Sequence, residues 1–194
     1  NLSTPIPLPI INDFSLQVAT VNGSGSQTSN NILLRAIFQM GIPVSGKNIF
    51  PSNIAGLPTW FTIRVNKDGY VARKKEIDIL VAMNPETVLE DIKTIVPGGV
   101  FVYNTDLKIT PERKDVFLYP IPFGELSKKC CPEATLRKMI TNMIYVGIIG
   151  AILNIEQDEM EKALRNHFKA KPKAVELNVA AIQTDSFDVT RLGG

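Results

Sequence analysis

The sequence predicts an α/β fold from three observations. Residues 15–22 alternate between apolar and polar side chains, and a glycine-rich turn and an apolar stripe at helical spacing follow them. Residues 77–83 are almost continuously apolar, which is typical of a strand buried in a parallel sheet. From about residue 134 the apolar spacing becomes helical. Together these patterns predict a Rossmann-like three-layer domain with a mostly parallel sheet, a hairpin insertion and C-terminal helices.

Length and composition predict one principal domain. The chain has 194 residues, of which 44% are hydrophobic and 21% are charged, and this is ordinary for a globular protein that buries a core. Residues 1–14 read as an extended arm, because Pro5, Pro7 and Pro9 alternate with isoleucine and leucine. We expect the domain to cover residues 15–190, and residues 191–194 to begin a linker or end the chain.

Charge and cysteine content exclude several function classes. A net charge of +2 gives no bulk electrostatic reason to expect nucleic acid or an anionic membrane as a partner. The apolar run at residues 140–155 is interrupted by Asn142 and Asn154 and is too short to span a bilayer. No secretory signal is visible, and the only cysteines are the adjacent Cys130 and Cys131. We therefore expect a cytoplasmic protein with no metal site or iron–sulfur cluster of its own.

The first half of the chain predicts strands separated by a helix and turns. We expect a helix at residues 29–40, closed by Gly41, and a strand at 60–65 whose hairpin partner is residues 70–73. Residues 77–83 form the buried strand. The segment Asn84–Pro85–Glu86–Thr87 resembles a helix start with proline at the first helical position, and this helix should end before Pro97.

The second half predicts two strands and then helices. Residues 100–103 and 116–122 read as strands, and the prolines of the latter predict the edge of a sheet. Helices are expected at about 136–153, where Gly147 and Gly150 would allow close backbone approach, and at 156–168 and 172–183. Cys130 and Cys131 read as small loop residues, and His167 as a surface residue.

The segment at residues 45–58 is the strongest candidate for a functional site. It is long, and its prolines, glycines and asparagines predict an irregular loop, while its apolar residues predict that the loop is anchored. Lys47 within it could pair with a carboxylate or phosphate as a point charge. A solvated lysine and turn-capping asparagines are the alternatives. The candidate residues of this loop are Ser45, Gly46, Lys47, Asn48 and Asn53.

The glycine turn before the first helix is a second candidate. Free N–H groups at a helix N-terminus bind anions, so the turn could contact phosphate, and the alternative is a tight structural turn that binds nothing. The dinucleotide fingerprint is incomplete, because its third glycine and its acidic residue are missing. The candidate residues are Gly23, Ser24, Gly25, Ser26, Gln27 and Thr28.

No complete catalytic set accompanies these two segments. The sequence shows no metal constellation, no clearly spaced carboxylate pair and no activated nucleophile. Such a chain reads as a subunit that completes an active site held elsewhere.

Three segments together resemble a known family. They are residues 23–30 (GSGSQTSN), residues 41–60 (GIPVSGKNIFPSNIAGLPTW) and residues 78–87 (DILVAMNPET). They are similar to the gamma-type domain of 2-oxoacid:ferredoxin oxidoreductases, and more narrowly to the form fused at the N-terminus of the alpha subunit. The resemblance covers about residues 16–184.

The resemblance implies a multisubunit enzyme that is inactive without its partners. It implies decarboxylation of a 2-oxoacid, with 2-oxoglutarate as the first expectation, on thiamine diphosphate with Mg²⁺. Alpha- and beta-type subunits would hold these groups and a [4Fe-4S] cluster, with ferredoxin as electron acceptor and coenzyme A as co-substrate. Lys47 would lie near the substrate carboxylate. In the fused form a pyrimidine-binding domain should follow, whereas this chain stops at Gly194, as a separate subunit or a fragment would.

Two other function classes stay open from the sequence. One is a free-standing nucleotide- or coenzyme-binding Rossmann-like module. The other is a structural subunit whose loop only packs at an interface.

Overall fold

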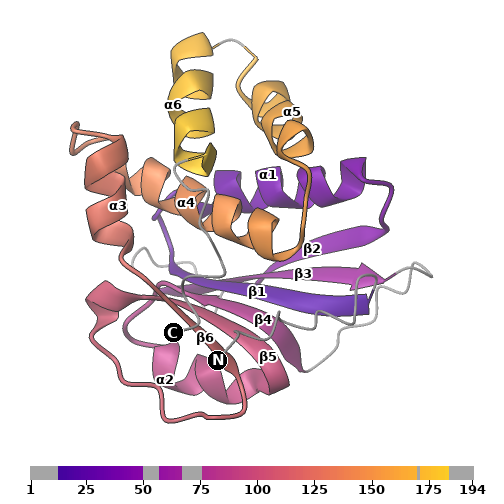
Figure 1. Ribbon diagram of the computed structural model, residues 1–194, viewed down its shortest axis with the longest axis vertical. Coiled ribbons are helices and arrows are strands. Elements are labelled where there is room, and N and C mark those ends of the chain that lie inside the picture. The colour runs from indigo at the N-terminus through magenta and orange to yellow at the C-terminus, as the bar shows by residue number, and fades with distance from the viewer. Residues whose placement is uncertain (1–12, 50–56, 67–75, 170, 184–194) are drawn as a thin grey trace, which may run out of the picture. The chain divides into compact units, whose positions relative to one another are not determined.

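The computed structural model describes residues 13–49, 57–66, 76–169 and 171–183 (Figure 1). The chain divides into two compact units, which are described separately. We call the first the sheet unit; its described residues are 13–23, 42–49, 57–66 and 76–122. The described residues of the second, the helical unit, are 24–41, 123–169 and 171–183.

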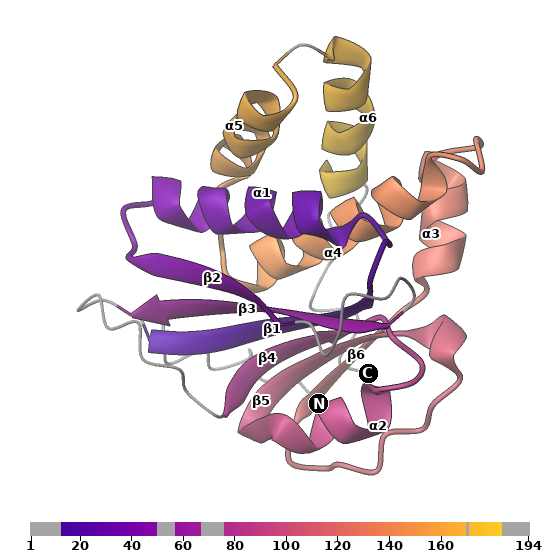
Figure 2. The same ribbon diagram turned by 180° about the vertical axis from the view of Figure 1, so that it is seen from behind.

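The sheet unit contains a mixed sheet of six strands among the described residues, in the order β2-β3-β1-β4-β5-β6. Strands β1, β4, β5 and β6 are mutually parallel, and β3 runs antiparallel to both β1 and β2. Figure 2 shows these strands from behind. In the pairing order, β2 and β6 are the two end strands. The strands are β1 (Asp13–Val21), β2 (Val44–Ile49), β3 (Pro58–Asn66), β4 (Ile77–Ala82), β5 (Ile95–Asn104) and β6 (Phe117–Ile121).

Short helical turns join the parallel strands of the sheet unit. Helix α2 (Val88–Asp91) runs directly into the 3₁₀ turn η1 (Ile92–Thr94), and η2 (Thr105–Leu107) follows β5. One buried cluster joins α2 and η1 to the middle of the sheet, and this burial of apolar surface stabilises the unit. Its members are Ala19, Ile77, Leu80, Ala82, Val88, Ile92, Ile95, Phe101, Tyr103 and Val116.

Two glycines shape the start of β5. The register between β4 and β5 shifts between Ile77 and Ile79, as at a β-bulge. Gly98 has a φ of 81°, which favours glycine, and its N–H donates to the carbonyl of Asp115 at 2.6 Å. At Gly99, a Cβ atom would lie 2.5 Å from Cγ2 of Ile95 and 2.9 Å from the carbonyl oxygen of Asp78. Glycine is therefore favoured at position 98 by the backbone conformation and at position 99 by the lack of space for a Cβ atom.

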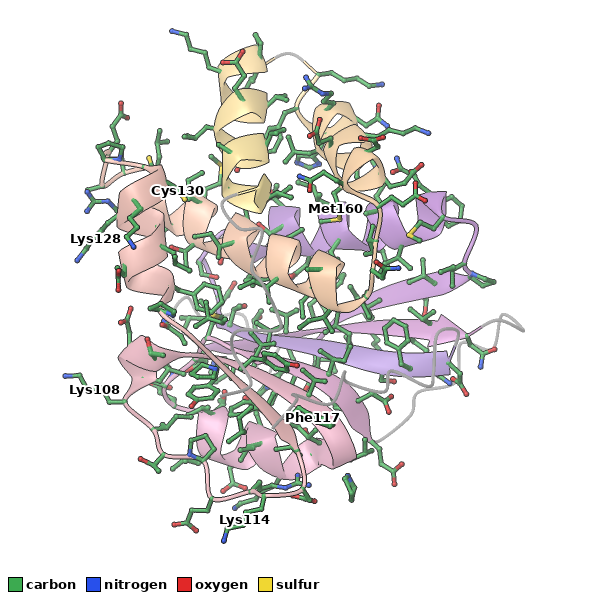
Figure 3. The ribbon with its side chains drawn as sticks, in the orientation of Figure 1. Lys108, Lys114, Phe117, Lys128, Cys130 and Met160 are labelled. Carbon is green, nitrogen blue, oxygen red and sulfur yellow. The ribbon has the colours of Figure 1, made fainter. Side chains whose placement is uncertain are left out.

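The helical unit is built on α1 and α4. Helix α1 packs against α4 and α5, and α4 packs against α3 and α6. The predicted close approaches at Gly147 and Gly150 are confirmed. A Cβ atom at Gly147 would lie 2.8 Å from the Ile182 carbonyl oxygen, and one at Gly150 would lie 3.2 Å from the methyl of Met160, which Figure 3 labels. The helices are α1 (Ser26–Gln39), α3 (Phe123–Cys130), α4 (Arg137–Ile152), α5 (Gln157–His167) and α6 (Pro172–Gln183).

Most of the predicted architecture is confirmed. The fold is α/β with a mostly parallel sheet followed by helices, and the apolar run at 77–83 is the buried parallel strand β4. The proline-containing strand β6 lies at a sheet edge, as predicted. Gly41 has a φ of 78° and closes α1 by donating its N–H to the carbonyl of Phe38. His167 is exposed at the end of α5, also as predicted.

Two predictions about local structure are wrong. Residues 84–87 do not begin a long helix, because the Asn84 side chain accepts from the N–H of Glu86 at 2.9 Å and holds a turn. The helix that follows is the single turn α2, and β5 begins at Ile95 rather than at Val100. Helix α3 was not expected, and Cys130 ends it rather than lying in a loop.

Some predictions fall outside the described residues. These are residues 1–12 of the predicted arm at 1–14, the hairpin partner at 70–73, Asn53 and the chain end at 191–194. The last two residues of the predicted arm, Asp13 and Phe14, are instead the first residues of β1. Across the segments that the structure does describe, none of the helices combines the length and the apolar character that a membrane span needs.

Candidate functional site

The predicted irregular loop at residues 45–58 is wrong in its first part. Ser45, Gly46, Lys47 and Asn48 lie within β2, which pairs antiparallel with β3 along its whole length. Glycine and asparagine are depleted in strands, so the sequence predicted a loop here rather than a strand. Backbone hydrogen bonding to β3 outweighs these weak preferences at a sheet edge. The result is that Lys47 sits in a fixed register.

The register of β2 places Lys47 in a row of polar side chains. Lys47 pairs with Thr62 of β3, and Thr62 pairs with Gln17 of β1. Paired residues on neighbouring strands point to the same face of a sheet, so all three side chains share one face. Lys47 is exposed, whereas Thr62 and Gln17 are half-buried. We call this set the polar row.

The next row along the same face carries a charge that is already paired. Arg64 pairs with Ser45 on one side and Ser15 on the other. Its guanidinium forms an ion pair with Asp13 and donates to the carbonyl oxygens of Phe14 and Val65 at 3.0 and 2.8 Å. The positive charge of Arg64 is therefore already paired within the fold. Lys47, in contrast, has no side-chain partner among the described residues.

The row on the other side is apolar and ends in a buried carboxylate. Trp60 pairs with Ile49 and Ala19, and its indole N–H donates to Oδ1 of Asp91 at 2.8 Å. The hydroxyl of Thr87 donates to Oδ2 of Asp91 at 2.6 Å. Asp91 is only 5% exposed, and this burial raises the pKa of its carboxyl, while the two hydrogen bonds act against the rise.

We expect Asp91→Asn to remove a pH dependence of stability. The ordinary pKa of the carboxyl is 3.8 and the folded value is higher, so the unfolded chain loses this proton at lower pH than the folded chain. The stabilisation from the bound proton is complete below the ordinary value and is lost as pH rises through the folded pKa. Urea unfolding between about pH 4 and pH 7 should show the variant gaining stability relative to the natural chain as pH rises. A constant difference would contradict this.

Buried polar side chains of α4 form hydrogen bonds with the glycine turn and with the start of α1. Gly23 and Gly25 have φ values of 82° and 79°. Within the helical unit, Nδ2 of Asn142 donates to the Ser24 carbonyl at 2.8 Å. The hydroxyl of Tyr145 donates to Oδ1 of Asn30 at 2.6 Å and lies 3.4 Å from the carbonyl of Ser26. Gln27 and Thr28 continue into the first turn of α1, which no acidic residue occupies.

Replacing Tyr145 with Phe should destabilise the helical unit. The side chain is fully buried, and burial raises the pKa of the phenol, so the hydroxyl remains a neutral donor. Its loss leaves Oδ1 of Asn30 without this bond, and we expect unfolding to become easier by about 1–3 kcal/mol. Denaturant unfolding measures the change. Tyr119→Phe is the matched control, because that tyrosine is also buried and its hydroxyl makes no hydrogen bond within the described segments. Equal losses in both variants would contradict the assignment.

The candidate residues thus fall into two groups that belong to different units. Ser45, Gly46, Lys47 and Asn48 are on β2 in the sheet unit, and Ser24, Gly25, Ser26, Gln27 and Thr28 open the helical unit. Sequence reasoning missed Thr62 and Gln17. The alternation of residues 60–65 was visible, but only the pairing of β3 with both β2 and β1 reveals that these two lie beside Lys47.

The described residues do not form a metal centre. No group of three or more histidine, cysteine, aspartate or glutamate side chains is close enough to hold a metal ion in the segments that the structure covers. Neither cysteine forms a disulfide, and the whole sequence holds no others. A cluster that needs four thiolates does not fit this chain alone.

Comparison with known sequences gives a consistent family. Residues 15–184 match the family described as pyruvate ferredoxin/flavodoxin oxidoreductase. A 2-oxoacid:ferredoxin oxidoreductase alpha subunit from Aeropyrum pernix is 21% identical over 88% of this chain and 33% of its own length. One from Sulfurisphaera tokodaii is 22% identical over 89% of this chain and 33% of its own length. The chain spans about a third of the length of these curated relatives.

Comparison with solved structures shows the same fold. A 2-oxoglutarate:ferredoxin oxidoreductase from Magnetococcus marinus, solved with 2-oxoglutarate, coenzyme A and succinyl-CoA, matches with a TM-score of 0.78 at 24% identity, over 89% of this chain and 30% of that one. A gamma subunit of a keto/oxoacid ferredoxin oxidoreductase from Geobacter sulfurreducens matches with a TM-score of 0.70 at 17% identity, over 88% of this chain and 94% of that one.

Proposed function

The chain belongs to the pyruvate ferredoxin/flavodoxin oxidoreductase family, and we propose that it is the gamma-type part of a 2-oxoacid:ferredoxin oxidoreductase. In this role it completes an active site for oxidative decarboxylation of a 2-oxoacid, with coenzyme A as acyl acceptor. We propose 2-oxoglutarate as the first substrate to test and the cytoplasm as the location. The observation that carries the proposal is the family match over residues 15–184.

The match to a gamma subunit from another organism supports the gamma-type assignment. The Geobacter sulfurreducens gamma subunit is matched over 94% of its length, whereas the Aeropyrum pernix alpha subunit is matched over 33% of its length. We therefore propose that alpha- and beta-type partners hold thiamine diphosphate, Mg²⁺ and a [4Fe-4S] cluster, and that ferredoxin accepts the electrons.

Within this complex we assign Lys47 to the carboxylate of the substrate. Its ammonium group is exposed at a fixed position on β2, and the neighbouring cation Arg64 is paired with Asp13. A positive charge at a defined position attracts the anionic 2-oxoacid and orients its carboxylate. Ser45, Gly46 and Asn48 hold the strand that presents it. Thiamine diphosphate, when bound by the partners, supplies the carbanion stabilisation that decarboxylation needs.

Co-purification from a native extract tests the proposal. A tagged chain should recover partners that contain thiamine diphosphate and iron. The recovered complex should reduce ferredoxin when a 2-oxoacid and coenzyme A are supplied, and the isolated chain should not. Recovery of the chain with no thiamine-containing partner would count against the proposal.

The glycine turn favours one competing function. Gly23 and Gly25 precede a 14-residue helix whose first turn carries no acidic residue, and such an N-terminus suits phosphate. A free-standing nucleotide- or coenzyme-binding module would use this turn. Calorimetry of the isolated chain with coenzyme A and with NAD separates the two functions, because tight binding of NAD would favour the module. Weak or absent NAD binding is the result that we expect.

A further inference from the structure

We propose that Thr62, with its hydroxyl oriented by Gln17, is a second donor to the substrate carboxylate beside Lys47. This inference rests on the proposed function and deepens it. It begins from the polar row, in which Lys47, Thr62 and Gln17 occupy one line across β2, β3 and β1 on a single face. Side chains of directly paired residues lie close enough to contact one ligand group together.

The direction of one hydrogen bond makes Thr62 a donor. Nε2 of Gln17 donates to Oγ1 of Thr62 at 3.5 Å, which is a long bond. A hydroxyl has a single hydrogen, and here its oxygen already accepts, so that hydrogen is left to donate. Among the described residues no acceptor is recorded for it. An ammonium and a hydroxyl on neighbouring strands can thus address the two oxygens of one carboxylate.

The two adjacent rows restrict what kind of ligand fits. On one side, the Arg64 guanidinium is paired with Asp13 and donates to two backbone carbonyls, so its charge is balanced, although its buried Nε has no partner among the described residues. On the other side, Ile49 and Trp60 are half-buried and apolar, and the indole N–H is already bonded to Asp91. A ligand with a carboxylate on the polar row would place its carbon chain along Ile49 and Trp60. This describes an aliphatic 2-oxoacid rather than inorganic phosphate.

Steady-state kinetics of the assembled complex test Thr62. Thr62→Val keeps the shape of the side chain and removes the donor, so the KM for the 2-oxoacid should rise roughly fivefold to tenfold with kcat nearly unchanged. Thr62→Ser keeps the hydroxyl and should stay within about twofold of the natural complex. Thr141→Val on α4 is the matched control, because that hydroxyl bonds only the Arg137 carbonyl of its own helix in the recorded contacts.

A double variant and a Gln17 variant keep the test decisive. Because both donors address one carboxylate, Thr62→Val should add less than about twofold to the KM of Lys47→Ala. Gln17→Met removes the hydrogen bond that orients the Thr62 hydroxyl and should raise the KM for the 2-oxoacid by roughly twofold to fourfold. This variant tests the role of Thr62 if the Thr62→Val complex does not assemble.

The outcomes separate this inference from the proposed function. An unchanged KM in Thr62→Val, together with a raised KM in Lys47→Ala, would overturn the role of Thr62 and leave that of Lys47 intact. Equal increases in Thr62→Val and Thr62→Ser would show that Thr62 only packs, and would also overturn it. If neither Lys47→Ala nor Thr62→Val changes KM, the assignment of Lys47 fails as well. Inorganic phosphate that competes as well as a 2-oxoacid would contradict the proposed ligand class.

Discussion

Replacing Lys47 with Ala in the assembled complex is expected to raise the KM for the 2-oxoacid by about 10- to 100-fold. The estimate follows from the loss of one hydrogen bond to a charged group, worth about 1.5–3 kcal/mol. Among the described residues, the neighbouring cation Arg64 does not substitute, because it is held by Asp13 and by two backbone carbonyls. If the carboxylate is also misoriented for reaction, kcat falls as well.

Two further variants make this result specific. Lys47→Arg retains the charge on a longer, planar group and should recover part of the lost affinity. Lys114→Ala removes an exposed lysine that points away from the fold in Figure 3, and it should leave the kinetics unchanged. Unchanged KM and kcat in Lys47→Ala, across every 2-oxoacid that the complex accepts, would exclude the assigned role.

Asn at position 99 should destabilise the sheet unit far more than Asn at position 98. A Cβ at Gly99 meets Cγ2 of Ile95 at 2.5 Å and the carbonyl oxygens of Asp78 and Val96 at 2.9 Å. Backbone oxygens cannot move without breaking the β4–β5 register, so we expect a loss of about 3 kcal/mol or more. At Gly98 nothing lies within 4 Å of the added Cβ.

At position 98, the backbone conformation determines how much stability the matched variant Gly98→Asn loses. Its φ of 81° lies in the left-handed region, which asparagine tolerates better than other side chains. Gly98→Asn should therefore cost only about 1 kcal/mol. Denaturant unfolding of both variants measures the difference, and similar losses would mean that conformation rather than space governs both positions.

The elements that could be predicted are those whose signal is local. The continuous apolar run of β4 arises because both faces of that strand are buried, and the apolar stripe of α1 arises because one face of that helix is buried. Gly41 ends α1 by a conformation that glycine favours. The strand β2 could not be predicted in this way, because Gly46 and Asn48 have poor strand preference and their pairing partner is distant in sequence.

The candidate site was predictable in its charge but not in its surroundings. Lys47 was visible in the sequence, whereas Thr62 and Gln17 join it only through the pairing of three strands. The turn at Asn84 was mistaken for a helix start because asparagine serves both structures, and only its bonds to Glu86 and to the carbonyl of Thr20 distinguish them.

The position of Lys47 on a paired strand limits how this part of the gene can change. Successive side chains of a strand point to opposite faces, so inserting or deleting one codon between Val44 and Lys47 would turn the lysine away from Thr62 while leaving the composition almost intact. A change of two codons would restore the face. Length differences among functional descendants of this chain should therefore come in pairs within β2.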